Sequence, residues 1–132
     1  MESHPSPVFF ESPDGLDVLC SLSGESGSGD PGWGEKLRKM TPNTTDGAKE
    51  KHLPVVTCDG NRVSIAVGDI FHPMEEAHYI AWVYLETCCG GYFRRLAPGR
   101  DPVAVFTLEE GETPRAAYAY CNLHGFWKTN LG

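Results

Sequence analysis

The sequence predicts an all-β protein whose main part is a β-sandwich. From residue 52 onward, short apolar segments rich in aromatic and β-branched residues recur about every eight to twelve residues, as in sandwich proteins. Clusters of Gly, Pro, Asn and Asp separate these segments and mark turns. No long stretch has the spacing of apolar residues that an amphipathic helix needs, so we expect about six or seven short strands.

The first 50 residues have a weaker pattern than the rest. Residues 8–10 and 16–22 predict two short strands. The segment 21–34 consists largely of Ser, Gly, Asp and Pro, a composition that buries little apolar surface and is typical of a loop or linker. Residues 35–40 fit either one helical turn or another strand, and both alternatives stay open.

The sandwich is expected to begin with a hairpin. Residues 53–57 form a short apolar run, and residues 59–61 (DGN) then supply a turn. In residues 63–67, Val or Ile alternates with Ser or Ala, which is typical of a strand buried on one face.

The later strands follow from composition and from glycine turns. Residues 79–87 (YIAWVYLET) are aromatic and β-branched on both faces, which predicts a strand buried on both sides. Gly90 and Gly91 then turn the chain into a strand at residues 92–96. Residues 103–108 and 115–120 supply two more strands.

Size and charge limit the possible functions. A chain of 132 residues is long enough for one main domain with a core of its own. The net charge of −7 argues against a general nucleic-acid binder, because such proteins need a basic surface. No uncharged apolar run approaches the roughly 20 residues of a membrane span, so we expect no membrane insertion.

The cysteine pattern argues against a disulfide framework. The five cysteines are an odd number and form no CxxC pair. The first residues lack the basic and then apolar pattern of a signal peptide. We therefore expect a cytoplasmic protein whose cysteines are buried thiols, surface thiols or metal ligands.

Two short motifs could hold a metal. His72 and His78 precede the strongest predicted strand, and a loop of this length can bring two imidazoles to one point. Cys121 and His124 follow the last predicted strand with C-x-x-H spacing, which can place a thiolate and an imidazole on one ion. Each motif alone is equally well read as surface histidines or as a buried cysteine near an unrelated histidine. Together they favour a metal site.

A third segment gives no clear signal by itself. Glu50 and Lys51 read as solvated surface charges, and His52 is not recognisable as a ligand from its pattern.

Three blocks of sequence carry a resemblance to a known family. They are EKHLPVV at residues 50–56, HPMEEAHYIAWV at residues 72–83 and AYCNLHGFWK at residues 119–128. In order and spacing they resemble the superoxide reductases, a family that includes desulfoferrodoxins and neelaredoxins. The resemblance covers about residues 43–128, and it implies an immunoglobulin-like β-sandwich.

The resemblance implies a mononuclear non-haem iron centre, Fe²⁺ or Fe³⁺, that reduces superoxide to hydrogen peroxide by one electron. It implies an axial thiolate and four equatorial imidazoles, supplied here by Cys121, His52, His72, His78 and His124. Mixed thiolate and imidazole donors suit iron, copper or zinc, and five protein ligands exceed the four of a structural zinc site.

The resemblance also implies roles for the two charged residues before His52. Lys51 would attract the superoxide anion and help to deliver a proton. Glu50 would occupy the open coordination position once the iron is ferric.

The surroundings of the thiolate can be anticipated in part. Phe126 and Trp127 would keep the sulfur dry, although core packing explains them equally well. Backbone N–H groups of Asn122 and Leu123 would donate to the thiolate.

The N-terminal region departs from the family. Desulfoferrodoxins hold a second iron there with four cysteines, whereas this region contains only Cys20, and an adjacent cysteine pair would fall near Gly32 and Trp33. We therefore expect a metal-free, degenerate desulforedoxin-like remnant with its linker at residues 1–50, an iron-binding domain at residues 51–132, and one iron per chain.

The other cysteines and the partners complete the prediction. Cys58, Cys88 and Cys89 read as ordinary thiols. The resemblance implies rubredoxin or a similar small redox protein as electron donor, and a homodimer. Two alternatives stay open: a superoxide dismutase that uses the same iron, and a non-catalytic metal-binding module.

Overall fold

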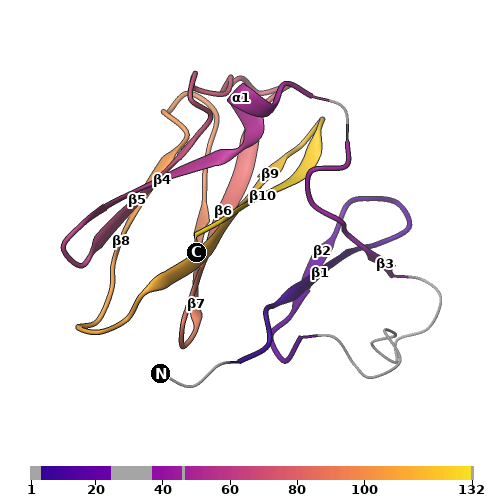
Figure 1. Cartoon of the computed structure of the whole chain (residues 1–132). Coiled ribbons are helices and arrows are strands. Elements are labelled where there is room, and N and C mark those ends of the chain that lie inside the picture. Colours follow the sequence, from indigo (N-terminus) through magenta and orange to yellow (C-terminus); the bar gives the residue numbers. More distant parts are fainter. Residues whose placement is uncertain (1–3, 25–36, 46, 132) are drawn as a thin grey trace. The chain divides into compact units, whose positions relative to one another are not determined.

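The structure is a computed structural model that describes residues 4–24, 37–45 and 47–131 (Figure 1). The chain divides into two compact units, one within residues 3–41 and one within residues 42–132. We call them the N-terminal unit and the sandwich domain. Residues 42–50, assigned to the linker from the sequence, are grouped with the sandwich domain.

The N-terminal unit is a small antiparallel sheet with strand order β2-β1-β3. Its strands are β1 (Val8–Glu11), β2 (Val18–Ser21) and β3 (Arg38–Lys39). The two strands predicted at residues 8–10 and 16–22 are confirmed, and the segment 37–40 contains a strand rather than a helical turn. Cys20 is exposed on β2. Gly32 and Trp33 lie outside the described residues.

The sandwich domain consists of two antiparallel sheets with strand orders β4-β5-β8 and β10-β9-β6-β7 (Figure 1). Its elements are α1 (Lys49–His52), β4 (Pro54–Asp59), β5 (Arg62–Val67), β6 (Ile80–Thr87), β7 (Gly91–Arg95), β8 (Val103–Thr107), β9 (Pro114–Cys121) and β10 (Gly125–Asn130). The predicted β-sandwich is therefore confirmed.

Sequence pattern and burial agree along the two strands with the clearest predictions. Val63, Ile65 and Val67 of β5 are each at most 1% exposed, whereas the residues between them are less buried. Along β6, Val83 and Leu85 face the core, and Trp82 and Tyr84 on the other face are also 9% exposed or less. The strand is buried on both sides, as its composition predicts.

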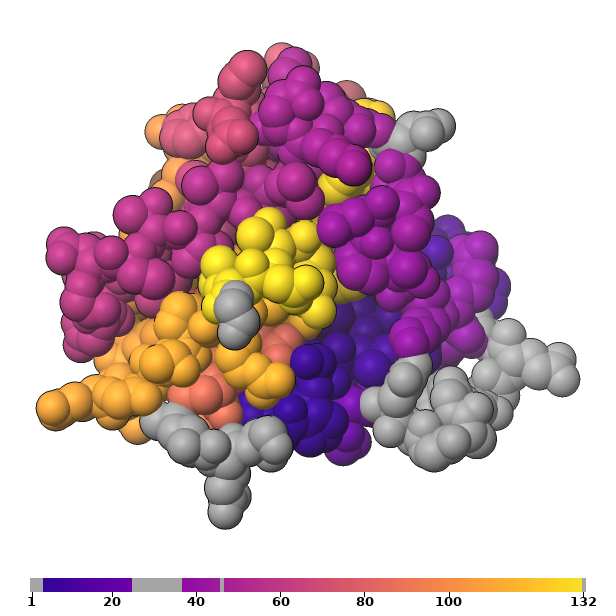
Figure 2. All heavy atoms as spheres, in the orientation of Figure 1, coloured from indigo at the N-terminus to yellow at the C-terminus, as the bar shows by residue number. Residues whose placement is uncertain are grey.

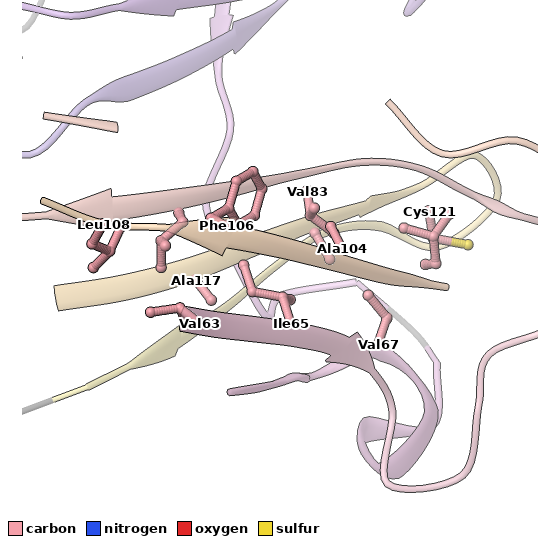
Figure 3. Close-up of a cluster of buried hydrophobic side chains, with 12 residues drawn as sticks. Val63, Ile65, Val67, Val83, Ala104, Phe106, Leu108, Ala117 and Cys121 are labelled. Atoms are coloured by element: carbon pink, nitrogen blue, oxygen red, sulfur yellow. The ribbon is translucent and has the colours of Figure 1, made fainter. Parts of the chain in front are cut away.

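The core lies between the two sheets. Figure 3 shows side chains of β5 and β8 pointing toward side chains of β6 and β9. Cys121, at the end of β9, is the last labelled residue at one end of this cluster (Figure 3). A residue at this end of the core, such as Cys121, can therefore be buried and still contact residues of the adjacent loops.

The sequence does not predict the final strand. The predicted strands end at residue 120, whereas the structure adds β10, which pairs with β9 over its whole length. The two strands are joined by a tight turn in which Gly125 has φ 77°, a value that favours glycine. The tight turn at residues 121–124 agrees with the C-x-x-H motif, whereas the strand that follows this turn was not predicted.

The segment before α1 adds to the edge of β10. The Asn43 amide nitrogen donates to the Lys128 carbonyl at 3.0 Å, and the Lys128 N–H donates to Asn43 Oδ1 at 2.9 Å. In Figure 2 the purple segment lies beside the yellow C-terminal strand, in keeping with these bonds. Within the described residues, no helix has the length and apolar character to cross a membrane.

Candidate metal centre

Five side chains converge at one end of the sandwich. Their donor atoms all lie within 4.8 Å of one another, and they belong to His52, His72, His78, Cys121 and His124. These are the five residues named as ligands from the sequence. They come from the helix α1, from the loop between β5 and β6, and from the turn between β9 and β10.

His52 is buried at the end of α1. The residue is 3% exposed, and its ring stacks on Trp127 of β10, with ring centroids 4.9 Å apart and an interplanar angle of 25°. Gly68 lies against α1, because a Cβ there would be 2.8 Å from the Lys51 carbonyl oxygen and 2.3 Å from that of Ile70. The chain directly after β5 therefore needs glycine at this close approach to α1, and its φ of 93° also favours glycine.

His72 and His78 lie in one loop whose shape is set by backbone bonds. The His72 N–H donates to the Val67 carbonyl at 3.1 Å, which holds the start of the loop to the end of β5. Glu75 and His78 exchange backbone hydrogen bonds of 3.0 Å in both directions. This turn brings the His78 ring back to within 4.5 Å of the His72 ring, centroid to centroid.

Cys121 and His124 belong to the β9–β10 turn. Cys121 is 0% exposed, and its Sγ accepts the backbone N–H of His124 at 3.4 Å. The His124 carbonyl accepts bonds from Trp127 Nε1, at 3.0 Å, and from the Thr45 hydroxyl. The turn is thus fixed on both sides of the ligand pair.

Asn122 joins the two ligand-bearing loops, and the sequence reasoning missed this role. Its side-chain oxygen accepts the Tyr79 N–H at 2.9 Å, and its side-chain nitrogen donates to the Ala77 carbonyl at 3.1 Å. The backbone N–H of Asn122 donates to the Tyr79 carbonyl. The expected hydrogen bond from this N–H to the Cys121 sulfur is therefore not formed. An asparagine directly after a strand is the only signal in the sequence, and it is a weak one.

The expected shield of aromatic residues around the sulfur is also different. Trp127 stacks on His52, whereas Phe126 lies on the opposite face of β10 and stacks on Tyr118 with centroids 5.6 Å apart. Neighbouring residues of a strand point to opposite faces, so the two aromatic side chains cannot share one role.

Two of the histidines are held in one tautomer. His52 Nδ1 lies 2.7 Å from the Ala48 carbonyl oxygen, and His72 Nδ1 lies 2.7 Å from that of Pro73. A carbonyl only accepts, so each Nδ1 carries the proton and each Nε2 carries a lone pair. The two Nε2 atoms are 3.1 Å apart. Two lone pairs at this distance repel each other unless a cation lies between them.

The remaining donor atoms support the same conclusion. Among the described residues, His78 Nε2 is a buried side-chain nitrogen with no hydrogen-bond partner, which is uncommon in folded proteins. Cys121 Sγ lies 3.3 Å from His72 Nε2 and 4.0 Å from His124 Nδ1. Four imidazoles and one thiol are donors that a transition metal accepts. The arrangement fits a metal ion.

Burial sets the protonation of these groups. Burial lowers the pKa of His72 to about 4, and it also lowers the pKa of His52. Both rings are therefore neutral at neutral pH, the form that binds metals. Burial raises the pKa of Cys121, although N–H groups of His124 and Leu123 donate to its sulfur and oppose this effect. A bound metal must therefore displace the thiol proton.

Glu50 and Lys51 lie on α1 directly before His52, and both are exposed. They stand outside the five-residue cluster. The Glu50 carbonyl accepts the backbone N–H of Ile70, which links α1 to the loop that carries His72.

Known proteins resemble the chain in sequence and structure. The profile of the Desulfoferrodoxin family matches residues 44–130. A desulfoferrodoxin homolog of Archaeoglobus fulgidus is 42% identical over 96 residues, which are 73% of this chain and 75% of the relative. A superoxide reductase of Pyrococcus horikoshii is 32% identical and covers 72% of this chain and 97% of its own length.

A solved structure agrees over most of the chain. The crystal structure of the superoxide reductase from Treponema pallidum has a TM-score of 0.80 and 37% identity, and covers 95% of this chain and 99% of its own. Fold, clustered ligands and sequence thus lead to the same group of proteins. The chain belongs to the Desulfoferrodoxin family.

Proposed function

We propose that this protein is a superoxide reductase, which reduces superoxide by one electron to hydrogen peroxide. The convergence of four imidazoles and one thiol on one point carries this proposal. Relatives that are named superoxide reductases share the sequence and the fold.

We propose iron as the metal, held by His52, His72, His78, His124 and Cys121. The donor set suits iron, and five side-chain ligands exceed the four that a structural zinc site uses. When bound, the iron supplies the single electron that superoxide takes up. The protein contributes neutral imidazoles, two of which are oriented by backbone carbonyls, and a buried sulfur that N–H groups hold in place.

Lys51 and Glu50 are the residues that we propose to act beside the ligands. Superoxide is an anion and the protein has a net charge of −7, so the exposed Lys51 ammonium beside His52 provides a local attraction. Hydrogen peroxide forms when the reduced oxygen receives two protons, and Lys51 with nearby water is our proposed source. We propose that the Glu50 carboxylate binds the oxidised, resting centre.

The electrons must come from another molecule. The exposed side chains of Ile70, Phe71 and Leu123 directly precede the ligands His72 and His124 in the chain. Exposed apolar side chains next to the ligands suit contact with a small redox protein, and we propose rubredoxin or a similar protein as the donor. We also propose a homodimer in the cytoplasm, where thiols stay reduced.

The decisive experiment is a peroxide balance. The iron-loaded protein is reduced without oxygen and exposed to limiting superoxide, and hydrogen peroxide and dioxygen are measured. A reductase forms about one peroxide for each superoxide and no dioxygen. About one peroxide for every two superoxides, with dioxygen, would instead identify a dismutase. No reaction would identify a non-catalytic metal-binding module.

A further inference from the structure

Two adjacent cysteines lie at the far end of β6 from the metal centre. β6 begins at Ile80, next to the ligand-bearing loop, and ends at Thr87, directly before Cys88 and Cys89. Its eight residues separate the two ends by roughly 25 Å, because a strand rises about 3.3 Å per residue. The proposed function makes no use of this pair.

The two sulfur atoms are already close. Cys88 Sγ and Cys89 Sγ are 4.0 Å apart, and Cys89 is exposed. Cys20 and Cys58 are exposed too, but they lie on β2 and β4, one in each unit of the chain. Gly90 follows the pair, and a Cβ on it would meet no heavy atom within 4 Å. The turn is thus open to small molecules.

Cys88 is held in a position that favours its thiolate. Its N–H donates to the Thr113 carbonyl at 2.9 Å, and the Thr113 N–H donates to its Sγ at 3.3 Å. The hydrogen bond from Thr113 lowers the pKa of Cys88. A thiolate is the reactive form of cysteine, so Cys88 is the better nucleophile of the pair.

Cys89 has the opposite character. Partial desolvation by its neighbours and the nearby Cys88 raise its pKa, and the Glu112 carboxylate adds to the effect. Its backbone N–H donates to Thr87 Oγ1 at 3.3 Å, and that hydroxyl donates to Glu112 at 2.5 Å. Cys89 therefore stays a protonated thiol that is hydrogen-bonded to the Glu112 carboxylate.

We propose that Cys88 and Cys89 form a dithiol that hydrogen peroxide oxidises reversibly to a disulfide. The Cys88 thiolate attacks one peroxide oxygen, the O–O bond breaks, and a sulfenic acid and hydroxide form. The Cys89 sulfur then attacks the sulfenic sulfur, its proton leaves and water departs. In total, two thiols lose two electrons and two protons, and one peroxide becomes two waters. This proposal rests on the proposed function only in that the reduction of superoxide would supply the peroxide.

The geometry explains why the oxidation would be reversible. Adjacent Cα atoms are about 3.8 Å apart across a trans peptide, less than the roughly 4.4–6.8 Å of ordinary disulfides. A disulfide between neighbours is therefore strained, and strained disulfides are reduced more easily.

The test adds equimolar hydrogen peroxide to the ferric, iron-loaded full-length protein and follows the peptide that contains Cys88 and Cys89 by mass spectrometry. The expected result is a loss of two hydrogen masses from this peptide, reversed by dithiothreitol. Cys89→Ser should accumulate a sulfenic acid that dimedone traps. Cys88→Ser should slow oxidation of Cys89 at least about tenfold, because the pKa of the Cys89 thiol is raised and little of it is thiolate. Cys58→Ser is the matched control and should behave like the wild type.

Several results would overturn the proposal. They are an unchanged peptide while Cys20 or Cys58 is oxidised, disulfide-linked dimers as the main product, or equal oxidation rates in Cys88→Ser and the wild type. Because peroxide is added directly, the outcome does not depend on turnover. A positive result here together with no peroxide from superoxide would reject the proposed function and leave the dithiol site standing.

Discussion

At the scale of the residue, the metal centre is prepared by hydrogen bonds to backbone carbonyls. His52 and His72 each donate Nδ1–H to a carbonyl, and each presents Nε2 to the cluster. Cys121 is fully buried and receives the N–H of His124. These contacts restrict the orientation of the rings and the position of the sulfur, and so direct the donor atoms toward one point.

Replacing the sulfur ligand is the sharpest test at this scale. Cys121→Ser removes the thiolate from the cluster, and we expect it to abolish peroxide formation from superoxide. Glu50→Ala removes an exposed carboxylate outside the cluster, and should leave the first reduction of superoxide nearly unchanged. Stopped-flow mixing with superoxide measures both variants, and Cys58→Ser is the control. Wild-type turnover in Cys121→Ser would rule out the thiolate as a required ligand.

At the scale of the element, the β6–β7 hairpin depends on one glycine. A Cβ on Gly91 would lie 1.8 Å from the Tyr84 hydroxyl oxygen, and Tyr84 is packed against Tyr118. The aromatic side chain thus lies over a position that has no side chain of its own. Tyr92, the next residue of β7, is tied instead to the loop before β9 through Glu112.

Gly91→Ala should therefore destabilise the protein. The added methyl group must displace the Tyr84 ring, and overpacking of this kind costs about 1–3 kcal/mol. Gly90→Ala is a matched control, because its Cβ meets no heavy atom within 4 Å. Urea unfolding of both variants measures the difference in free energy. Equal losses of unfolding free energy in the two variants would mean that backbone entropy, and not the contact with Tyr84, causes the destabilisation.

Glu112 should make stability depend on pH. Burial alone would raise its pKa, but hydrogen bonds from Thr87 and Tyr92 outweigh burial and lower the pKa below its ordinary value. A carboxyl with a lowered pKa stabilises the fold above its unfolded pKa, and this stabilisation disappears as the pH falls through the folded pKa. Glu112→Gln should cost about 1–2 kcal/mol at pH 7.

The measurement is urea unfolding of wild type and Glu112→Gln at pH 7 and at several acidic values, with both proteins in the same metal state. The difference should shrink as the pH falls, because the wild-type carboxyl then becomes neutral. The hydrogen bond to Glu112 raises the pKa of Tyr92 to about 12, so the Tyr92 hydroxyl stays protonated and remains a donor at every pH of this measurement. A difference that is constant with pH would contradict the assignment.

At the scale of the whole molecule, the chain combines a complete sandwich domain with a small N-terminal sheet. The sandwich domain supplies all five clustered donors. The N-terminal unit contains one cysteine, Cys20, and one thiolate is too few to hold an iron in the way that four cysteines do.

The metal content of the purified protein should therefore be about one iron per chain. Cys20→Ser should leave this ratio unchanged, whereas Cys121→Ser should lower it, because only the second change removes a donor of the cluster. Metal analysis against protein concentration measures the ratio. A ratio near two that falls in Cys20→Ser would show a second centre in the N-terminal unit.

The strands with clear patterns and the two short ligand motifs could be predicted from the sequence alone. Alternation in residues 63–67 and the apolar run at residues 79–87 reflect burial, which acts on each strand locally. Cys121 and His124 are three residues apart, so one turn suffices to join them. His52 was predicted as a ligand only from the resemblance to a family, because the pattern of its own segment does not indicate a ligand.

The contacts between these pieces depend on long-range packing, which only the folded structure shows. His52 and His124 are 72 residues apart in the chain, and contact between them depends on strand pairings that no local pattern encodes. The same holds for Asn122, which joins the two ligand loops, and for Cys88, whose sulfur accepts the Thr113 N–H. Local residues set which elements form, and packing of distant elements sets which side chains become neighbours.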